Sequence, residues 1–202
     1  GQELGPNEEG YVVIKLPLPP GTLMTIWNDT ERFKAGYLKK FDGYYFSGDG
    51  GFKDDEGYIY ITGRVDDVIN VAGHRLSTAE MEEIVASHPS VAECAVVGIE
   101  DELKGQIPLA LAVIKSGDEI EHFQLQHEVV HLVREQIGAV ASLKDVVIVN
   151  RLPKTRSGKI LRKLLRQIGD GVEYQIPSTI DDEAIIGEVV EVFQKSKIGS
   201  FK

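Results

Sequence analysis

The first 65 residues alternate apolar and polar positions in the way that β-strands do. Apolar runs cover residues 11–19 and 46–65. Glycines and a DDEG turn interrupt the second run. Residues 28–41 predict one short helix, and Asp29 or Thr30 is the expected cap. Residues 1–65 therefore predict a small β-rich subdomain.

After residue 65 the pattern changes to amphipathic stretches that alternate with longer apolar runs. A helix is predicted at 77–88, where Pro89 ends it, and a second one at 123–138. Apolar runs of strand length cover 91–100, 109–116 and 147–152. With a third helix after residue 159, this order predicts an α+β domain at 66–168, with a short mixed or antiparallel sheet and flanking helices.

The pattern weakens from Gly169 onward. Residues 169–202 predict a peripheral tail, within which 185–195 can form a terminal helix. The fold class expected for the whole chain is therefore α+β, with the β-rich subdomain first, the α+β domain second and the tail last.

Composition is that of a folded chain with a real core, since 42% of its 202 residues are hydrophobic. No stretch approaches the roughly 18 apolar residues of a membrane span, and no secretory leader is recognised. We therefore expect no membrane partner and a cytosolic or organellar compartment. Cys94 is the only cysteine, so a disulfide within the chain is excluded and a buried, small hydrophobic role is expected.

Positive charge is concentrated in one place. The net charge is −10, yet residues 151–168 hold seven basic side chains and no acidic one. A compact patch without interleaved aromatic residues is unlike the broad basic face of nucleic-acid binders, so no nucleic acid is expected. The segment favours a local anion site, and a solvated basic helix face is the alternative.

The sequence PKTRSGKILRKLLR, residues 153–166, gives this segment a finer interpretation. Thr155, Ser157 and Gly158 predict a small polar loop, because glycine adopts dihedral angles that other residues avoid. The cations of the following helix are expected to face outward: Arg162, Lys163 and Arg166. Lys159 is thus the one cation whose placement the loop controls. An ammonium group delivered to a phosphate stabilises the charge of phosphoryl or nucleotidyl transfer.

Two other stretches carry candidate chemistry. Residues 47–64 join a glycine-flanked carboxylate, Asp49, to Arg64; such a carboxylate can accept two hydrogen bonds from the vicinal hydroxyls of a ribose. A tight turn containing aspartate is the alternative. HEVVH, residues 127–131, matches the H-E-x-x-H pattern of zinc enzymes. No convincing third ligand follows and the histidines lie off the apolar stripe, so no metal site is expected.

Four motifs in order resemble one family: YYFSGDGG, ITGRVDDVINVAGHRLSTAEMEE, VREQIG and LPKTRSGKILRK. They are similar to the carboxyl-terminal part of the AMP-forming acyl-CoA synthetases, in the short-chain acetate and propionate branch of the adenylate-forming superfamily. The resemblance covers essentially the whole chain. It implies that 1–65 is the end of a large N-terminal adenylation domain and that 66–168 is a mobile C-terminal domain.

The resemblance also implies residue roles in adenylation. Asp49 matches the acid that binds the ribose hydroxyls of ATP and AMP, Arg64 assists it, and Arg75 contacts nucleotide phosphate. Lys159 matches the lysine that reaches the α-phosphate and the carboxylate while acyl-AMP forms. Asp66 matches the hinge about which the small domain rotates.

Roles in the CoA step follow from the same resemblance. Gly73 matches the glycine beside the pantetheine tunnel, where a side chain would obstruct the thiol, and Arg134 matches a cationic contact to CoA phosphate. The positions of Lys159 and Gly73, on opposite sides of the small domain's sequence, agree with the alternation that the resemblance implies, because two reaction steps make different demands on one site.

The implied activity is that of an acid–thiol ligase. Acetate or propionate and ATP give acyl-AMP and pyrophosphate, and CoA then displaces AMP. ATP, CoA and Mg²⁺ are the expected cofactors, and the remainder of the N-terminal adenylation domain, expected upstream, is the partner that holds the Mg²⁺ site. The compartment is expected to be the cytoplasm or the mitochondrial matrix. The alternatives are a non-catalytic binding module that uses 151–168 and an adenylating enzyme that loads a carrier protein.

Overall fold

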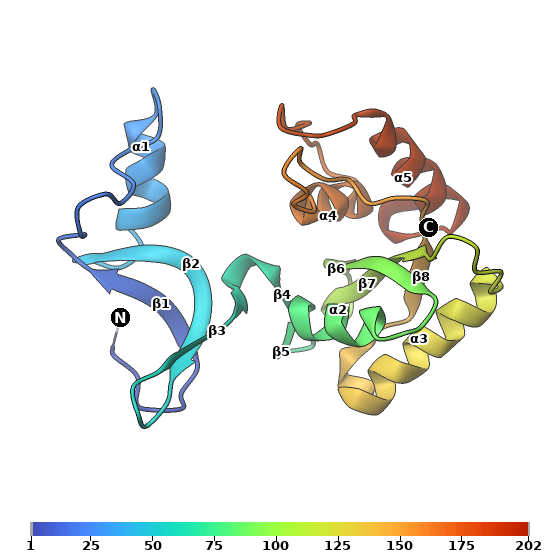
Figure 1. Ribbon diagram of the computed structural model, residues 1–202, viewed down its shortest axis with the longest axis horizontal. Helices are drawn as coiled ribbons and strands as arrows, with labels where there is room; N and C mark the ends of the chain where they lie inside the picture. Colours follow the sequence, from blue (N-terminus) through green and yellow to red (C-terminus); the bar gives the residue numbers. More distant parts are fainter. Residues whose placement is uncertain (1, 202) are drawn as a thin grey trace. The chain divides into compact units, whose positions relative to one another are not determined.

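The computed structural model describes residues 2–201, which divide between Asp66 and Asp67 into two compact units (Figure 1). Unit 1 contains the residues up to Asp66, and unit 2 contains those from Asp67 onward. The division lies one residue beyond the boundary expected from the hydrophobic pattern.

Unit 1 is a three-stranded antiparallel sheet in the order β1–β2–β3 (Figure 1). Its elements are β1 (Gly10–Lys15), α1 (Thr30–Phe33), a π-helical turn (Lys34–Leu38), β2 (Tyr44–Lys53) and β3 (Ile59–Arg64). Of the two expected caps, Asp29 is the one observed: its carboxylate accepts a hydrogen bond from the backbone N–H of Arg32 at 3.0 Å. The helix expected at 28–41 is therefore present as one α-helical turn that continues into a wider one.

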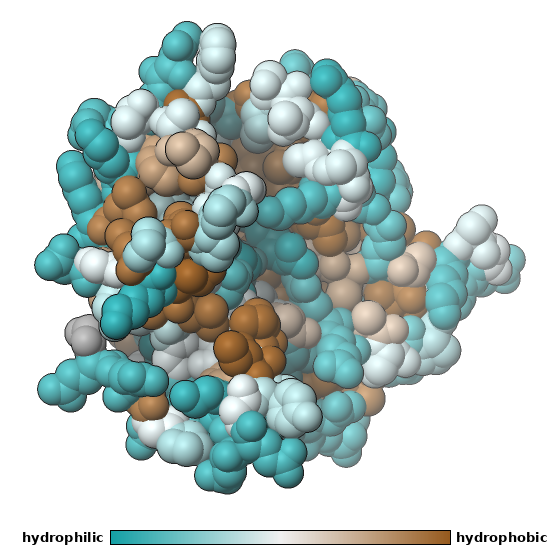
Figure 2. All heavy atoms as spheres, turned by 60° about the vertical axis from the view of Figure 1, so that its left-hand side comes forward, coloured by the Kyte–Doolittle hydropathy of each residue, from teal (hydrophilic) through white to brown (hydrophobic). Residues whose placement is uncertain are grey.

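Unit 1 buries little apolar surface. Phe33 is its only buried hydrophobic side chain among the described residues, whereas Trp27 is 89% exposed and Met24 is 84% exposed. Figure 2 turns the side of the molecule that bears unit 1 forward and shows brown apolar side chains exposed among teal polar ones. A small sheet needs a covered apolar face for independent stability, so unit 1 is expected to require a packing partner.

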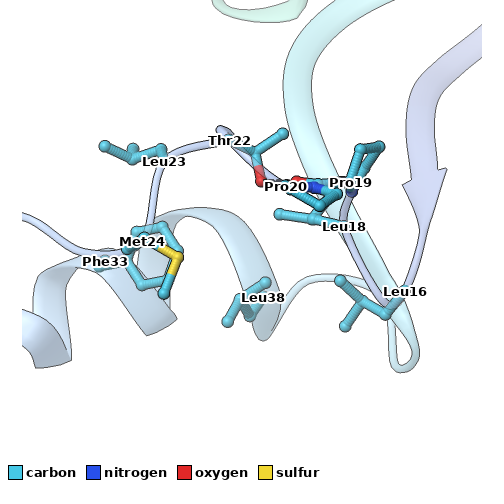
Figure 3. Close-up of a pocket in the computed structure, with 9 residues that line it drawn as sticks. All are labelled: Leu16, Leu18, Pro19, Pro20, Thr22, Leu23, Met24, Phe33 and Leu38. Atoms are coloured by element: carbon cyan, nitrogen blue, oxygen red, sulfur yellow. Dashed lines mark hydrogen bonds between the residues drawn. The ribbon is translucent and has the colours of Figure 1, made fainter.

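A shallow apolar recess of about 350 Å³ belongs to this uncovered surface (Figure 3). It lies between the loop after β1 and the helical segment, and it is lined by Leu16, Leu18, Pro19, Pro20, Thr22, Leu23, Met24, Phe33 and Leu38. Its lining holds no charged group, so the recess is unsuited to a phosphate or a carboxylate.

Unit 2 is a five-stranded mixed sheet with helices on both faces (Figure 1). Its strands are β4 (Val68–Val71), β5 (His74–Ser77), β6 (Val91–Asp101), β7 (Gly105–Ile114) and β8 (Asp145–Ile148). Its α-helices are α2 (Thr78–Ala86), α3 (His122–Gln136), α4 (Arg162–Asp170) and α5 (Ala184–Lys195). Strands β5, β4, β7 and β6 pair in that order and antiparallel, and β8 pairs with β7 in parallel. The α+β class and the mixed sheet are therefore confirmed.

Successive residues of the central strands supply two separate cores. On β6, Ala95 and Val97 pack in one cluster with residues of α4 and α5, while Val96 packs in the other with residues of α2 and α3. Strand side chains point alternately to the two faces, and here both faces are covered. For this reason β6 and β7 are nearly continuous apolar runs in the sequence, and their length was the signal for strands.

The hairpin of β4 and β5 is absent from the sequence prediction, which begins this domain with a helix. The two strands have four residues each and are joined by Ala72 and Gly73, whose φ angles are 48° and 89°. Positive φ at both central residues is the requirement of a type I′ turn, for which Asn-Gly is the usual signal. Alanine at the first position hides that signal.

Residues 169–202 are the main difference from the sequence prediction, which makes them a peripheral tail. α5 forms within this segment, and its Val189 and Phe193 are fully buried. Ile180 and Ile198 are each 3% exposed and join the same cluster as residues of β6, β7 and α4. The segment is thus part of the core of unit 2. Among the described residues, no helix is both long and apolar enough to cross a membrane.

Replacing Phe193 with alanine tests this integration. Because the ring is fully buried, Phe193→Ala should lower the free energy of unfolding of unit 2 by about 3–5 kcal/mol, measured by the loss of helical circular dichroism in denaturant. Lys195→Ala on the same helix is the control and should change it by less than about 0.5 kcal/mol, since that side chain is 72% exposed. Equal effects of the two variants would contradict the packing described above.

Candidate functional site

Lys159 lies in a tight hairpin of the backbone. Lys154 and Ile160 form an isolated antiparallel bridge at its base. Inside the bridge, the N–H of Thr155 donates to the carbonyl of Lys159, and the N–H of Gly158 donates to the carbonyl of Thr155, both at 2.8 Å. Gly158 has a φ of 83°, which glycine adopts without strain. The small polar loop expected from the sequence is therefore present, with the chain reversal at Gly158.

The loop leaves the ammonium group of Lys159 unengaged. The hydroxyl of Thr155 accepts the backbone N–H of Lys159 at 3.1 Å and lies 3.0 Å from the hydroxyl of Ser157. The side chain of Lys159 is exposed, and within residues 2–201 its Nζ forms no hydrogen bond or ion pair. The backbone is thus held while the charge stays available to a ligand.

The seven cations of residues 151–168 divide into two groups. Three form ion pairs within unit 2: Arg151 with Asp182 and Glu188, Lys154 with Glu93, and Arg162 with Glu82. Over the described part of the chain, the other four have no acidic partner: Arg156, Lys159, Lys163 and Arg166. Part of the basic segment is therefore structural, and the rest is available to anions.

Arg162 departs from the expectation that it faces outward. Its guanidinium binds the carboxylate of Glu82 on α2 through two hydrogen bonds of 2.9 and 2.7 Å, and both side chains are largely buried. Glu82 also accepts the N–H of Val96 at 2.8 Å. The hydrogen bond to Glu82 raises the pKa of Arg162 and outweighs the opposing effect of burial. The pair thus ties the start of α4, directly after the Lys159 hairpin, to α2 on the other face of the sheet.

Asp49 and Arg64 meet across neighbouring strands of unit 1. They are directly paired in the register of β2 and β3, and Nη1 of Arg64 lies 3.4 Å from Oδ1 of Asp49. The same guanidinium donates to the carbonyl of Ser47 at 3.1 Å and to Oδ1 of Asp66 at 3.1 Å. Burial lowers the pKa of Arg64, but the nearby Asp66 and Asp49 outweigh that effect and raise it. Three of the expected site residues are therefore together.

Gly48 makes room for this arrangement. It has a φ of 85°, and a Cβ atom there would lie 2.6 Å from Nη2 of Arg64. Within residues 2–201, Oδ2 of Asp49 forms no hydrogen bond, and the side chain is 32% exposed. The carboxylate thus keeps acceptor capacity for hydroxyl groups, as the binding of a vicinal diol requires. Sequence reasoning did not single out Ser47 or Gly48, although both stand beside Asp49 in SGDGG.

Gly73 lies in the β4–β5 turn, at a different part of unit 2 from Lys159. The N–H of Ala72 donates to the carbonyl of Lys104 in the β6–β7 turn at 2.8 Å. A Cβ atom at Gly73 would meet nothing within 4 Å, so within this chain the positive φ is what favours glycine. Arg75 on β5 and Arg134 near the end of α3 are exposed. In the described part of the chain neither forms an ion pair, and no contact joins them to Gly73.

The Lys159 hairpin and the Gly73 turn lie near opposite ends of β6. Lys154, at the base of the hairpin, pairs with Glu93 near the start of β6. The Gly73 turn is hydrogen-bonded to the β6–β7 turn, which lies at the far end of β6. β6 runs for eight residues beyond Glu93, or about 26 Å at roughly 3.3 Å per residue. The two sites therefore lie at opposite ends of unit 2.

The HEVVH helix uses its glutamate for packing. Glu128 accepts hydrogen bonds of 2.8 Å from Nε2 of the buried His88 and from Gln124, and these bonds lower the pKa of Glu128. His131 lies 3.3 Å from Glu135. No group of three or more His, Cys, Asp or Glu residues within 2–201 is arranged to hold a metal ion. The glutamate thus links α3 to the end of α2.

Cys94, on β6, is half-buried beside α2. Its thiol donates to the carbonyl of Glu82 at 3.3 Å. Burial, assisted by the charge of Glu82, raises the pKa of the thiol to about 11. The thiol is therefore protonated at neutral pH and behaves as a small packing group.

Comparisons with known proteins agree with this geometry. Residues 80–159 match the family described as the AMP-binding enzyme C-terminal domain. The chain is 49% identical over 195 residues to the mouse protein named acyl-CoA synthetase short-chain family member 3, mitochondrial, with 96% of the chain covered. It is 43% identical over 201 residues to the acetyl-coenzyme A synthetase of Pyrobaculum aerophilum, with 98% covered. It spans only 29% of the length of each of these relatives.

A solved structure supports the same relationship. The chain resembles ATP-bound MatB from Rhodopseudomonas palustris with a TM-score of 0.68 and 28% identity. The match covers 83% of this chain and 31% of MatB.

Removing the hydroxyl of Thr155 should loosen the hairpin. Thr155→Val deletes the acceptor of the Lys159 N–H, and a net hydrogen bond of about 1 kcal/mol corresponds to roughly fivefold faster amide exchange at Lys159. Thr155→Ser keeps the oxygen and should leave the exchange rate near that of the wild type. Unchanged exchange at Lys159 in the valine variant would show that the hydroxyl does not hold the loop.

Proposed function

We propose that this chain, which belongs to the adenylate-forming superfamily and carries its AMP-binding C-terminal domain at residues 80–159, acts as part of an AMP-forming short-chain acyl-CoA synthetase. The substrates are acetate or propionate, ATP and CoA. The observation that carries the proposal is the unpaired ammonium of Lys159, presented on a backbone hairpin that is itself fully hydrogen-bonded at its base.

The first half-reaction is carboxylate adenylation. A carboxylate oxygen of the acid attacks the α-phosphorus of ATP, a P–O bond forms, and the bond to the β-phosphate breaks to release pyrophosphate. Negative charge grows on the α-phosphate oxygens in this step. The ammonium of Lys159 offsets that charge, which is the kind of electrostatic contact that contributes most to such reactions.

Asp49 and Arg64 are proposed to hold the nucleotide during this step. The unpaired Oδ2 of Asp49 accepts hydrogen bonds from the two ribose hydroxyls, and Arg64 keeps the carboxylate oriented through Oδ1. Support comes from Gly48, which lets the guanidinium lie against the backbone beside Asp49. The exposed cation Arg75 is proposed to contact a nucleotide phosphate.

The second half-reaction is thioester formation. The thiol of CoA loses its proton, its sulfur attacks the acyl carbon, and the C–O bond to AMP breaks. Gly73 is proposed to border the path of the pantetheine arm, and Arg134, exposed at the end of α3, to contact a phosphate of CoA.

The two half-reactions require different ends of unit 2 at one active site. Lys159 and Gly73 lie at opposite ends of the sheet, so both cannot approach the same bound acyl group at once. We propose that unit 2 rotates between the steps about Asp66, at the boundary of the two units.

The rest of the large adenylation domain is the proposed partner of unit 1. Support comes from the exposed apolar side chains of unit 1, which lack a covering layer within the described residues. Within residues 2–201, no group of three or more His, Cys, Asp or Glu residues could hold a metal ion, and the Mg²⁺ site is proposed to lie in that partner domain. The compartment proposed is the cytoplasm or the mitochondrial matrix; the mouse relative's name includes mitochondrial.

The exchange of labelled pyrophosphate into ATP tests the role of Lys159. In the full-length protein, exchange should depend on acetate or propionate, and Lys159→Ala should reduce it by at least about 100-fold because one transition-state contact is lost. Thioester formation from supplied acyl-AMP should stay within about twofold of the wild type.

Lys163→Ala is the matched control, since Lys163 is another unpaired, exposed cation of the same segment. It should leave both half-reactions unchanged. Absence of exchange in the folded wild type with either acid would overturn the proposed activity and favour a binding module. Equal loss of both half-reactions in Lys159→Ala would overturn the alternation.

Gly73→Leu should show the reverse selectivity. Gly73→Ala is its matched control, because any L-residue at a φ of 89° bears a similar backbone strain of about 1–2 kcal/mol. Leucine should therefore lower thioester formation at least about tenfold below the alanine variant, while the two melt at similar temperatures and both retain adenylation. Equal thioester rates in the two variants would mean that strain, and not obstruction of the thiol, explains glycine at this position.

A further inference from the structure

A segment beyond α4 contacts the Lys159 hairpin along its outer strand. Thr155 and Ile180 form an isolated antiparallel bridge. The N–H of Arg156 donates to the carbonyl of Thr179, and the N–H of Asp181 donates to the carbonyl of Lys154, both at 2.9 Å. Residues 177–182, here named the brace, thus add a third strand-like edge to the hairpin. They lie outside the region that matches the AMP-binding C-terminal domain, which ends at residue 159.

The brace is itself firmly attached to unit 2. Ile180 is 3% exposed and packs in the cluster that holds residues of α4 and α5. Asp182 accepts a hydrogen bond of 2.6 Å from Arg151, and its other oxygen accepts the N–H of Ala184 at the start of α5. Arg151 also binds Glu188 of α5 at 2.6 Å. The brace therefore connects the hairpin to the buried C-terminal helix.

Besides the brace, side chains at its two ends attach the hairpin to unit 2, through the packing of Leu152, Ile160 and Leu161 and through ion pairs. Lys154 pairs with Glu93 before the loop, and Arg162 pairs with Glu82 after it. Residues 156–159 between them are exposed and polar, and such loops open easily when few contacts hold them. Backbone bonds from the brace restrain this part of the hairpin directly.

We propose that the brace is a positioning element for Lys159 in adenylation. This inference rests on the proposed function, because it assigns the brace to one half-reaction of that enzyme. By holding the outer strand of the hairpin, the brace keeps the ammonium within reach of the α-phosphate when unit 2 delivers it. Positioning to better than about 1 Å is worth up to about 100-fold in rate, so loss of the brace lowers adenylation. It leaves thioester formation unaffected, since that step uses the opposite end of the sheet.

Asp181→Pro in the full-length protein removes the N–H that binds the carbonyl of Lys154. Proline also favours extended backbone at Ile180, which suits the antiparallel bridge there. Gln175→Pro is the matched control, because Gln175 lies just before the brace in the same connection between α4 and α5, and its N–H forms no hydrogen bond within residues 2–201. Asp182→Asn is a milder second variant that weakens the contact with Arg151 but keeps an acceptor for Ala184.

The expected result is a fall of about 10- to 100-fold in kcat for pyrophosphate exchange in Asp181→Pro, with KM for ATP within about twofold. Thioester formation from supplied acyl-AMP should be unchanged. Asp182→Asn should lower pyrophosphate exchange by a smaller factor and should also leave thioester formation unchanged. Gln175→Pro should match the wild type. Equal loss of both half-reactions, or no loss in either, would overturn the proposal, because a merely structural defect does not select one step.

Hydrogen exchange separates the failure of this inference from failure of the proposed function. Amides of residues 154–160 should exchange faster in Asp181→Pro than in Gln175→Pro, whatever reaction the protein performs. Unchanged exchange there would overturn the brace even in an active enzyme. If the wild type shows no pyrophosphate exchange, the proposed function fails, while faster amide exchange would still establish the brace as the support of the hairpin.

Discussion

Burial of β6 and β7 on both faces is the constraint on which unit 2 depends. Each strand contributes one row of side chains to the core that packs against α4 and α5, and the other row to the core that packs against α2 and α3. Both strands are therefore long and apolar along their middle, and polar or charged groups stand mainly at their ends. The Lys159 hairpin occupies one end and the Gly73 turn the other. A two-faced core thus accounts for the separation of the two proposed sites within a single small domain.

Charge pairing distinguishes structural cations from available ones. Arg162 and Glu82 form two hydrogen bonds and are largely buried. Removing either side chain would leave the other as an unpaired buried charge. Arg64 is shared among Asp49, Asp66 and a backbone carbonyl, which orients one carboxylate oxygen and leaves the other available. In both places the paired cation fixes the local backbone and side-chain geometry. The groups left without a partner among the described residues are the ammonium of Lys159 and Oδ2 of Asp49.

Local chemistry was readable from the sequence, and long-range contacts were not. The polar loop around Gly158 and the cap at Asp29 follow from residue type and spacing, and both are present. The outward position assigned to Arg162 was wrong because Glu82, its partner, lies 80 positions earlier in the chain. The tail was misjudged for a similar reason, since Phe193 is buried by elements from distant parts of the sequence.

The unpaired state of Lys159 has a consequence for how this protein can change over time. Its side chain is exposed and makes no contact with the described residues, so the fold gains nothing from its charge. Stability therefore places little constraint on this position, whereas at Arg162 the largely buried pair with Glu82 does. Under the proposed role of Lys159, a lineage that lost adenylation would be free to replace this lysine while retaining the hairpin around it, so an intact fold with a different residue here would mark a change of activity.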